Sequence, residues 1–518
     1  MRTRRALGLF LAFSLLFCML PTPARANTPT QAETLLASMS PTEKVGQLFL
    51  ITFSGSSISE GSLLRNLITT YHIGGFVLRA DHDNFSGTDT LASVYNLIAD
   101  MQTAAWDKSQ PSPNTSLGGE LPAYVPLFIG IEQNGNSASQ ILSGLSDQPN
   151  QMTLGATWSP SLAQQAGQVL GSELSALGFN LFLGPTLDVA ETTSMETAAY
   201  SGADLYGADP YWVGEIGRAY IAGLHAGSLN RLSVIARHFP GLGSTDRPPD
   251  LEVATVRKSL EQLKQIELAP FFAVTSAEDP NAQADGVMVS HIRFQGFQGN
   301  IRATTRPISF DATALSQLLA VEPLASWRSA GGLTVSDSLG SKAVRSFFDP
   351  TGQSFDANTI AGSAFIAGND MLYLNNFTSS GETKPYETIL QTLDYFSGKY
   401  EEDPAFAQRV DQAVLRILNV KLQLYGEFTL ETVIPDRAGL DQIGSTSDVA
   451  FNIAREAVTL ISPSQDYLNS LLPSPPGTYE YMVIFSDQRT NKQCSTCQPI
   501  YELSTNMFQN TLLKLYGQ

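Results

Sequence analysis

The strongest constraint on the fold is a series of eight short segments that are almost continuously apolar. Each segment is brief and shows little polar alternation, and most of them end near Gly, Pro, Asp or His. Apolar runs of this kind are typical of strands buried on both faces, as in a parallel sheet. The segments are 44–53, 74–79, 125–133, 179–189, 232–240, 285–292, 331–339 and 369–374.

The intervals between these segments carry apolar residues at helical spacing. Residues 160–178 and 409–426 are the clearest examples, and each ends at a glycine, Gly178 or Gly426. Eight strands alternating with helices predict an α/β fold, a (β/α)8 TIM-type barrel. An open doubly wound sheet is the alternative, but no Gly-x-Gly-x-x-Gly follows the first strand, which weakens a dinucleotide-binding interpretation.

Polar side chains collect where these strands are expected to end. In a barrel the carboxyl ends of all strands meet at one mouth, where active sites lie. Any one such residue is more often a helix cap or a structural hydrogen-bonding group, but six together favour a functional site. They are Glu132, Asp188, His238, His291, Asp337 and Asp370.

The two ends of the chain differ in character from the middle. Arg2, Arg4 and Arg5 precede an apolar stretch and an Ala-x-Ala pattern, so residues 1–26 are expected to be a secretory signal peptide. The barrel is then expected over 27–435. Residues 436–518 are predicted to form a reduced or truncated α/β C-terminal domain, with strands at 455–463 and 479–487.

Charge and cysteine content limit the partners. Removing residues 1–26 takes away four arginines, which changes the formal net charge from -18 to -22. Such a surface repels nucleic acid and anionic membranes, and no later segment is apolar enough to span a bilayer. Cys494 and Cys497 are expected to form a local disulfide rather than half of a zinc site. The five histidines lack metal-ligand spacing, so neither a metal nor another cofactor is expected.

An ordered series of motifs runs between residues 36 and 465. It includes KVGQLFL, HIGGFVL, PLFIGIEQNG, MTLGATWSPSLAQQAGQVLGSELSALGFNLFLGPTLDV, YGADPYWVGEIGRAYIAGL, RHFPGLGST, DGVMVSHI, LTVSDSLG, AGNDMLYL and VLRILNVKLQLYGEF. This series resembles glycoside hydrolase family three, especially its β-N-acetylhexosaminidase branch. The resemblance implies a (β/α)8 barrel, often followed by an α/β sandwich domain. It also implies a retaining β-glycosidase whose nucleophile is the aspartate of VSDSLG, Asp337. The alternative for Asp337 is a cap for the helix that follows.

The acid/base loop departs from the family pattern K-H-F-P-G-H-G-x-T-x-x-D-S-H. Pro248 stands where the orienting aspartate is expected, Asp250 where the histidine is expected, and Leu242 replaces the middle histidine. Asp250 is the predicted replacement acid, if its pKa is raised in a closed site. Asp246 and Glu252 are further candidates, and each of the three is otherwise a solvated carboxylate.

The resemblance also marks positions that bind the sugar. Glu132 replaces an aspartate of the family, and Gln140 and Asp204 stand where arginines are usual. Arg237 replaces a lysine, and His238 is retained. The predicted substrate-binding residues are Glu132, Gln140, Asp188, Arg237, His238 and His291.

Two functions follow from these observations. The leading hypothesis is a secreted glycosidase that cleaves terminal β-linked sugars, with Asp337 and Asp250 as catalytic residues. The alternative is a non-catalytic relative that binds glycans or acts as a scaffold. A loop 243–253 that brings Asp250 to the sugar site favours catalysis, and a loop that points away favours the alternative.

Overall fold

The computed structural model describes residues 29–516, apart from 88, 112–120, 134, 136–141, 192–201, 463, 472–476, 478, 480, 482, 486–489 and 502–503. The expected signal peptide and the predicted sugar-binding residue Gln140 lie outside the described residues.

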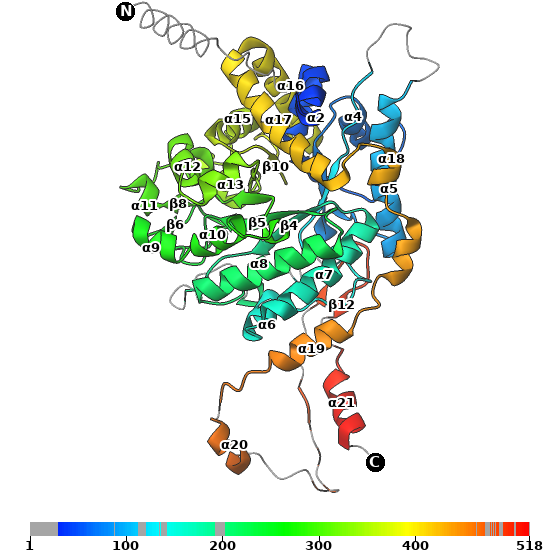
Figure 1. Cartoon of the computed structure of the whole chain (residues 1–518), viewed down its shortest axis with the longest axis vertical. Helices are drawn as coiled ribbons and strands as arrows, with labels where there is room; N and C mark the ends of the chain where they lie inside the picture. The colour runs from blue at the N-terminus through cyan, green and yellow to red at the C-terminus, as the bar shows by residue number, and fades with distance from the viewer. Residues whose placement is uncertain are drawn as a thin grey trace, which may run out of the picture.

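Eight parallel strands form the centre of the molecule (Figure 1). Their order in the sheet is β10-β1-β2-β3-β4-β5-β7-β9, and a parallel bridge between Val335 and Met371 joins β9 back to β10. The sheet therefore closes into the predicted barrel, and every strand lies within one of the eight predicted segments. The strands are β1 Phe49–Ile51, β2 Gly75–Leu78, β3 Phe128–Ile131, β4 Leu181–Thr186, β5 Ser233–Phe239, β7 Gly286–Val289, β9 Leu333–Ser336 and β10 Leu372–Leu374.

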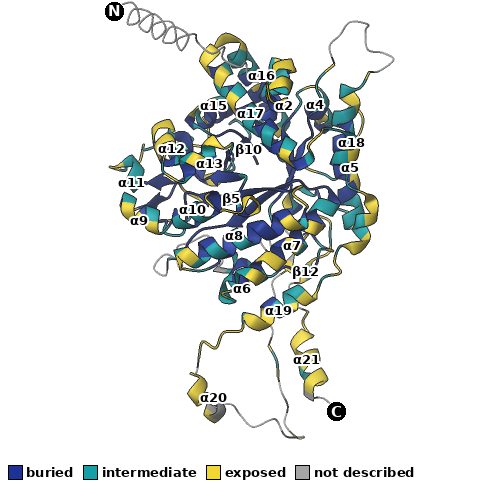
Figure 2. Cartoon of the chain, in the orientation of Figure 1, coloured by how far each residue is buried: buried dark blue, intermediate teal, exposed yellow. Residues whose placement is uncertain are grey.

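All residues of these eight strands are buried, which explains why their sequences show no polar alternation (Figure 2). Helices cover the outside of the barrel. The two clearest sequence-predicted helices are confirmed: α7 ends at Gly178, whose φ of 95° is left-handed, and α17 ends at Gly426. The helices up to residue 425 are α2 Gln31–Ser38, α3 Pro41–Gln47, α4 Leu63–Thr69, α5 Thr90–Ser109, α6 Gln151–Ala156, α7 Pro160–Leu177, α8 Pro210–Gly227, α9 Leu260–Gln265, α10 Ala269–Thr275, α11 Gln295–Gln298, α12 Ala312–Leu319, α13 Leu324–Ser329, α14 Lys342–Phe348, α15 Ala357–Ala367, α16 Pro385–Glu402 and α17 Pro404–Tyr425.

A second, very small parallel sheet lies beside the barrel. It consists of β6 Thr255–Val256 and β8 Arg293–Phe294, which pair in the register Thr255 with Arg293. These strands follow the loop 240–254 and the end of β7, so they fix the outer boundary of the loop that carries Asp250.

The C-terminal region consists of short helices, one short antiparallel strand pair and irregular segments, and much of it is exposed. After α18 Leu430–Val433 come a 3-10 helix η5 Arg437–Gln442, α19 Asp448–Glu456, α20 Gln465–Leu471, the antiparallel pair β11 Thr490–Asn491 and β12 Ile500–Tyr501, and α21 Met507–Tyr516. In Figure 1, α20 and α21 lie away from the barrel. The expected disulfide between Cys494 and Cys497 is confirmed.

The strand predicted over 455–463 is wrong in the part that the structure describes. Arg455 and Glu456 end α19, and residues 457–462 form no strand. Val458 and Ile461 are 81% and 93% exposed, so no neighbouring layer covers the apolar side chains that suggested a strand. The second predicted strand, 479–487, lies partly outside the described residues, and its described part is not a strand. A reduced α/β domain over 436–518 therefore stays a prediction. No helix in the described part of the chain combines the length and apolarity needed to cross a bilayer.

Candidate active site

Five of the six predicted strand-end residues lie at the carboxyl ends of their strands, at the mouth of the barrel. Asp370 is the exception, because it precedes β10 and its carboxylate accepts a hydrogen bond from the Thr334 N–H near the start of β9 (3.1 Å). In the segment 369–374 the polar residues come before the apolar run, so they fall at the start of the strand. Asp370 thus lies at the opposite end of the barrel, which we call the base.

Asp337 and Asp250 line one pocket at the mouth, with a volume of about 430 Å³. Asp337 directly follows β9, and its Oδ1 accepts a hydrogen bond from the Ser338 N–H (2.7 Å). It does not cap the next helix, because Ser341 is the N-cap of α14. The pocket is lined by Leu242, Pro249, Asp250, Ser290, His291, Ile292, Asp337, Ser338, Gly340, Ser341, Lys342, Arg345, Asn375 and Asn376.

His291 holds the backbone next to Asp337. One ring nitrogen, Nδ1, lies 2.8 Å from the Ser309 hydroxyl, and Nε2 lies 3.0 Å from the Ser338 carbonyl oxygen. Burial lowers the pKa of His291, although Asp337 and the hydrogen bonds to the loop act in the opposite sense. A neutral ring that donates from Nε2 and accepts at Nδ1 fits both contacts. With both nitrogens bonded to protein, His291 has the contacts of a positioning residue, and its predicted sugar contact stays a prediction.

Hydrogen bonds between Asp246 and Thr255 hold together the two ends of the loop that carries Asp250. Asp246 accepts a hydrogen bond from the Thr255 N–H at Oδ1 (2.9 Å), and its own N–H donates to the Thr255 carbonyl (3.1 Å). Within the loop, the N–H groups of Leu251 and Glu252 both lie 3.2 Å from the Pro248 carbonyl oxygen. This tight turn points Pro249 and Asp250 into the mouth pocket.

The start of this loop requires a glycine at position 243. A Cβ at this position would lie 1.6 Å from the carbonyl oxygen of Val189, which no side chain allows. The loop therefore passes directly over the end of the β4 segment. Leu242, which replaces a histidine of the family pattern, is buried there and donates its N–H to Asp188 Oδ1 (2.6 Å).

The surroundings of Asp250 favour its protonated form. The residue is exposed to the open pocket, yet protein atoms enclose it enough that loss of solvent raises the pKa of its carboxyl. The negative charges of Asp337 and Glu132 also raise this pKa, whereas His238 and Arg237 act to lower it. The net direction is upward, as a general acid requires.

The other two carboxylates considered for the acid lie elsewhere. Asp246 pairs with Arg247 (3.2 Å) and Arg257 (3.1 Å). Although partial burial acts to raise the pKa of Asp246, the Thr255 N–H and these arginines bring it below its ordinary value. Glu252 pairs with Arg247 (3.0 Å) and is 62% exposed. Neither lines the mouth pocket, so the structure brings only Asp250 to Asp337.

Glu132 is the centre of a partly buried charge network. Its two oxygens accept from Arg237 Nη1 (2.9 Å) and Arg79 Nη1 (3.2 Å), and the Tyr373 hydroxyl lies 3.3 Å from Oε1. Burial acts to raise the pKa of Glu132, but the two arginines outweigh it and lower the pKa. Arg79 was missed by the sequence analysis, although it ends the predicted strand 74–79 and so had the same strand-end signal.

Asp188 and His238 form a second pair at the mouth. Asp188 is fully buried, and its Oδ2 lies 2.9 Å from His238 Nδ1. Together with the bond from the Leu242 N–H, this carboxylate joins β4, β5 and the start of the Asp250 loop. The pair thus holds His238 in one orientation near Asp250, whose pKa it affects.

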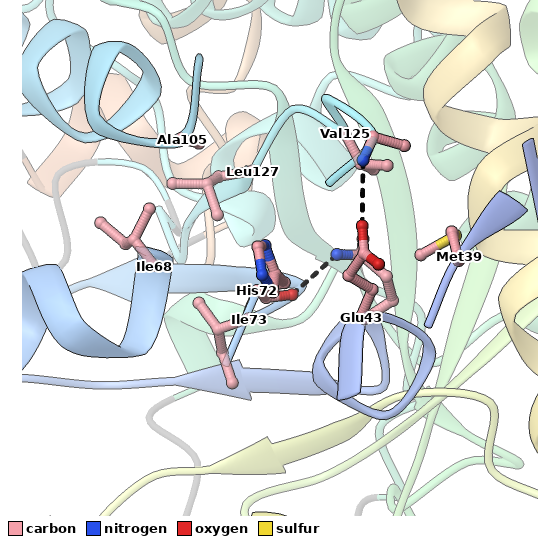
Figure 3. Close-up of a pocket in the computed structure, with 10 residues that line it drawn as sticks. Met39, Glu43, Ile68, His72, Ile73, Ala105, Val125 and Leu127 are labelled. Carbon is pink, nitrogen blue, oxygen red and sulfur yellow. Dashed lines mark hydrogen bonds between the residues drawn. The ribbon is translucent and has the colours of Figure 1, made fainter. Parts of the chain in front are cut away.

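A much smaller pocket lies at the base of the barrel, around His72 (Figure 3). Glu43 accepts a hydrogen bond from the Ala123 N–H (3.0 Å), and Gln47 donates to the His72 carbonyl (2.8 Å). The volume of this pocket, about 20 Å³, suffices for one water molecule and excludes a sugar. Of these two pockets, only the one at the mouth has the size for a monosaccharide.

The C-terminal disulfide turn touches the mouth from outside. The N–H and hydroxyl of Ser495, inside the Cys494–Cys497 turn, donate to the two carboxylate oxygens of Asp83 (2.5 and 2.9 Å). Asp83 is the C-cap of the 3-10 helix η1 Ala80–His82, which directly follows Arg79. This contact joins the C-terminal segment to the loop beside the Glu132 network.

Comparison with known proteins agrees with this geometry. The family model described as "Glycosyl hydrolase family 3 N terminal domain" matches residues 41–420. Beta-hexosaminidase A of Pseudoalteromonas piscicida is 24% identical over 372 residues, which are 70% of this chain and 55% of that protein. A beta-N-acetylglucosaminidase/beta-glucosidase of Cellulomonas fimi is 26% identical over 429 residues, 83% of this chain and 65% of that protein. The chain thus spans 55% and 65% of the length of these two relatives.

Solved structures show the same fold. A glycoside hydrolase family 3 beta-N-acetylglucosaminidase from Paenibacillus sp. str. FPU-7 superposes with a TM-score of 0.63 at 24% identity, covering 81% of this chain and 69% of that one. Beta-N-acetylhexosaminidase from Beutenbergia cavernae gives a TM-score of 0.57 at 24% identity, covering 74% of this chain and 98% of that one.

Proposed function

This chain belongs to glycosyl hydrolase family 3, and we propose that it hydrolyses terminal β-linked sugars, N-acetylhexosaminides among them, by a retaining mechanism. The observation that carries the proposal is the shared pocket at the barrel mouth, which Asp337 and Asp250 line together. Two carboxyl groups in different environments are what glycoside cleavage requires.

In the first step, Asp337 is the nucleophile. A carboxylate oxygen forms a bond to the anomeric carbon while the bond from that carbon to the leaving oxygen breaks. Asp250 in its protonated form, which its raised pKa favours, donates its proton to the leaving oxygen. The products of this step are the free alcohol and a sugar ester of Asp337.

In the second step, Asp250 acts as the base. It takes a proton from a water molecule, the water oxygen bonds to the anomeric carbon, and the ester bond to Asp337 breaks. The sugar leaves with its original anomeric configuration, and both carboxyl groups return to their starting protonation states.

Glu132, Arg237 and His238 are proposed to bind the hydroxyl groups of the sugar. Arg79 and Arg237 keep Glu132 ionised, so it accepts hydrogen bonds without donating any. Asp188 orients His238 from behind through Nδ1. Asp188 is therefore proposed as a positioning residue for substrate binding.

We also propose that the protein is exported. Residues 1–26 have the pattern of a signal peptide, and the Cys494–Cys497 disulfide suits an oxidising compartment. N-terminal sequencing of the protein recovered outside the cytoplasm is expected to begin at Asn27. Recovery of the intact Arg2–Arg5 segment only from the cytoplasm would contradict export.

The catalytic proposal is tested with two kinds of β-N-acetylglucosaminide. A dinitrophenyl leaving group departs without protonation, whereas an alkyl group needs an acid. The wild type is expected to cleave both, and Asp337→Asn neither. Asp250→Asn is expected to keep the first attack on the dinitrophenyl substrate but to lose cleavage of the alkyl substrate.

The other outcomes are equally informative. Cleavage of only the dinitrophenyl substrate by the wild type would show that Asp337 works and that Asp250 is not an acid. An Asp337→Asn variant as active as the wild type would overturn the nucleophile assignment. No cleavage of any sugar by the folded wild type would leave the non-catalytic, glycan-binding alternative.

A further inference from the structure

A second pocket, of about 500 Å³, adjoins the mouth pocket and has an unusual charge. We call it the arginine pocket. Four arginines line it, although the whole chain has a formal net charge of -18. Counting these four against the carboxylates of Asp246 and Glu252 leaves two positive charges. The lining residues that matter here are Arg247, Glu252, Arg257, Arg293, Arg302 and Phe347.

Two of the four arginines have no carboxylate partner within the described part of the chain. Arg293 is buried, and its guanidinium donates to the carbonyl oxygens of Thr305 (2.8 Å), Ala303 (2.8 Å) and Val253 (3.3 Å). It also lies over the ring of Phe347, 5.4 Å from the ring centroid. Arg302 is exposed and makes no ion pair with a described residue. Backbone carbonyls hold the Arg293 charge in place without neutralising it, as in a site prepared for an anion.

The arginine pocket and the mouth pocket share their walls. In the loop, Pro249 and Asp250 face the mouth pocket, whereas Arg247 and Glu252 face the arginine pocket. The same alternation occurs after β7, where Ile292 lines the mouth pocket and Arg293 lines the arginine pocket. It occurs again in α14, where Arg345 lines the mouth pocket and Ser346 lines the arginine pocket. A group attached to a sugar in the mouth pocket therefore has a short path to the arginines.

We propose that the arginine pocket is a subsite for an oxyanion that the substrate carries beyond the bond to be cleaved, a carboxylate or sulfate on the leaving-group side. This inference rests on the proposed function, because it places the anion relative to the sugar that Asp337 attacks. Planar guanidinium groups bind such oxygens in pairs and distinguish them from neutral hydroxyl groups. The preferred substrate is thus an acidic glycan.

The test uses two disaccharides that differ only in charge. N-acetylglucosamine is β-linked to glucose in one and to glucuronic acid in the other, at constant ionic strength. Arg302→Ala is the test variant, since this side chain supports no other described residue. Arg306→Ala is the matched control, because Arg306 is exposed and does not line the pocket.

We expect Arg302→Ala to lower kcat/KM for the glucuronide about fivefold, as for one partly exposed charge pair, and to leave the glucoside within about twofold. Arg306→Ala is expected to change neither. Equal losses on both substrates, or no loss on either, would overturn the subsite. Sodium sulfate distinguishes an anion carried by the substrate from a free anion. Inhibition of glucuronide cleavage alone supports the subsite. Equal inhibition of the cleavage of both substrates would assign the pocket to a free anion and overturn the proposed subsite.

A failure of catalysis is separable from a failure of the subsite. If the wild type cleaves neither disaccharide, the proposed function fails, and calorimetry with the uncleaved glucuronide then measures binding directly. Weaker binding by Arg302→Ala than by Arg306→Ala would support the oxyanion site without catalysis. Equal binding by both variants would overturn it.

Discussion

The two ends of the barrel each contain a carboxylate held by arginines, partly buried at the mouth and fully buried at the base. At the mouth, Glu132 contacts Arg79 and Arg237. At the base, Asp370 contacts Arg328, Arg409 and Arg416. At both places burial acts to raise the pKa of the carboxyl group, but the arginine charges outweigh it and lower the pKa. The same chemistry thus occurs at both ends of one parallel sheet.

The surroundings of these two carboxylates differ. Asp370 also accepts from the Thr334 N–H and hydroxyl, both at 3.1 Å, so its oxygens are saturated by the protein. Glu132 lies at the mouth, within electrostatic reach of Asp250. We therefore expect the same carboxylate–arginine pairing to stabilise the scaffold at the base and to take part in sugar binding at the mouth. The difference comes from what else lies nearby, and the following experiments are designed to separate these roles.

The largest effect is expected at the mouth. Asp337→Asn removes the proposed nucleophile and is expected to lower kcat by about a thousandfold or more. Since Asp337 caps no helix, the denaturant midpoint is expected to stay at the wild-type value. Steady-state kinetics and urea unfolding measure the two quantities, and a large loss of stability would place Asp337 in the scaffold.

Asp370→Asn is expected to show the reverse pattern. The change leaves three arginines without their carboxylate, so the free energy of unfolding is expected to fall by about 3–5 kcal/mol. Because Asp370 lies far along the barrel from the mouth, kcat of the folded fraction is expected to be unchanged. Urea unfolding checks the first expectation, and a stability equal to that of the wild type would contradict it.

Glu132→Gln is expected to affect function more than stability. The neutral amide binds sugar hydroxyl groups and Arg237 less strongly, and kcat/KM is expected to fall about 10- to 100-fold. The loss of stability is expected to be smaller than for Asp370→Asn, because Arg79 keeps its two hydrogen bonds to Asp81, both 2.9 Å. A variant with normal kcat/KM and reduced stability would make Glu132 a scaffold residue like Asp370.

The pH dependence is expected to distinguish Asp250 from an ordinary carboxylate. In the proposed mechanism its protonated form donates the proton. Because its pKa is raised, cleavage of an alkyl glycoside is expected to persist above the usual aspartate pKa of about 3.9. Activity is then lost as the pH rises through the raised pKa, about tenfold per pH unit. Cleavage of a dinitrophenyl glycoside is expected to lack this descending limb. An identical limb for both substrates would assign it to another group.

The smallest effect is expected from the disulfide. Reduction of Cys494–Cys497 opens a loop of sequence separation three, which is worth at most about 2 kcal/mol, and only in the C-terminal segment. The Ser495 contact with Asp83 is expected to loosen, with a change in KM of about twofold at most. Thermal unfolding and kinetics in reducing buffer check this. A loss comparable to that of Glu132→Gln would make the disulfide turn part of the site.

The barrel was predictable because strands buried on both faces have sequences without polar alternation, and the glycines 178 and 426 mark helix ends. The position of Asp370 was not predictable in the same way. A polar residue beside an apolar run lies at one end of the strand or the other, and only the pairing of Thr334 with Asp370 decides which.

The grouping of strand-end residues at the barrel mouth was predictable from the sequence, but the contacts among them were not. The strand-end position of Arg79 was visible in the sequence, but its contact with Glu132, 53 residues away, was not. The direction of Asp250 depends on the bonds between Asp246 and Thr255, which no local pattern shows. The strand expected at 455–463 failed because apolar side chains indicate a strand only where another layer covers them, and Val458 and Ile461 are exposed.

The loop between Asp246 and Thr255 keeps its shape independently of the side chain at position 250. Its shape depends on the bonds at its two ends and on the Pro248 turn, none of which involves the side chain of Asp250. The side chain that we propose as the proton donor can therefore be replaced without altering the path of the loop. The barrel, the proposed nucleophile Asp337 and the passage of the chain over Val189 do not depend on it.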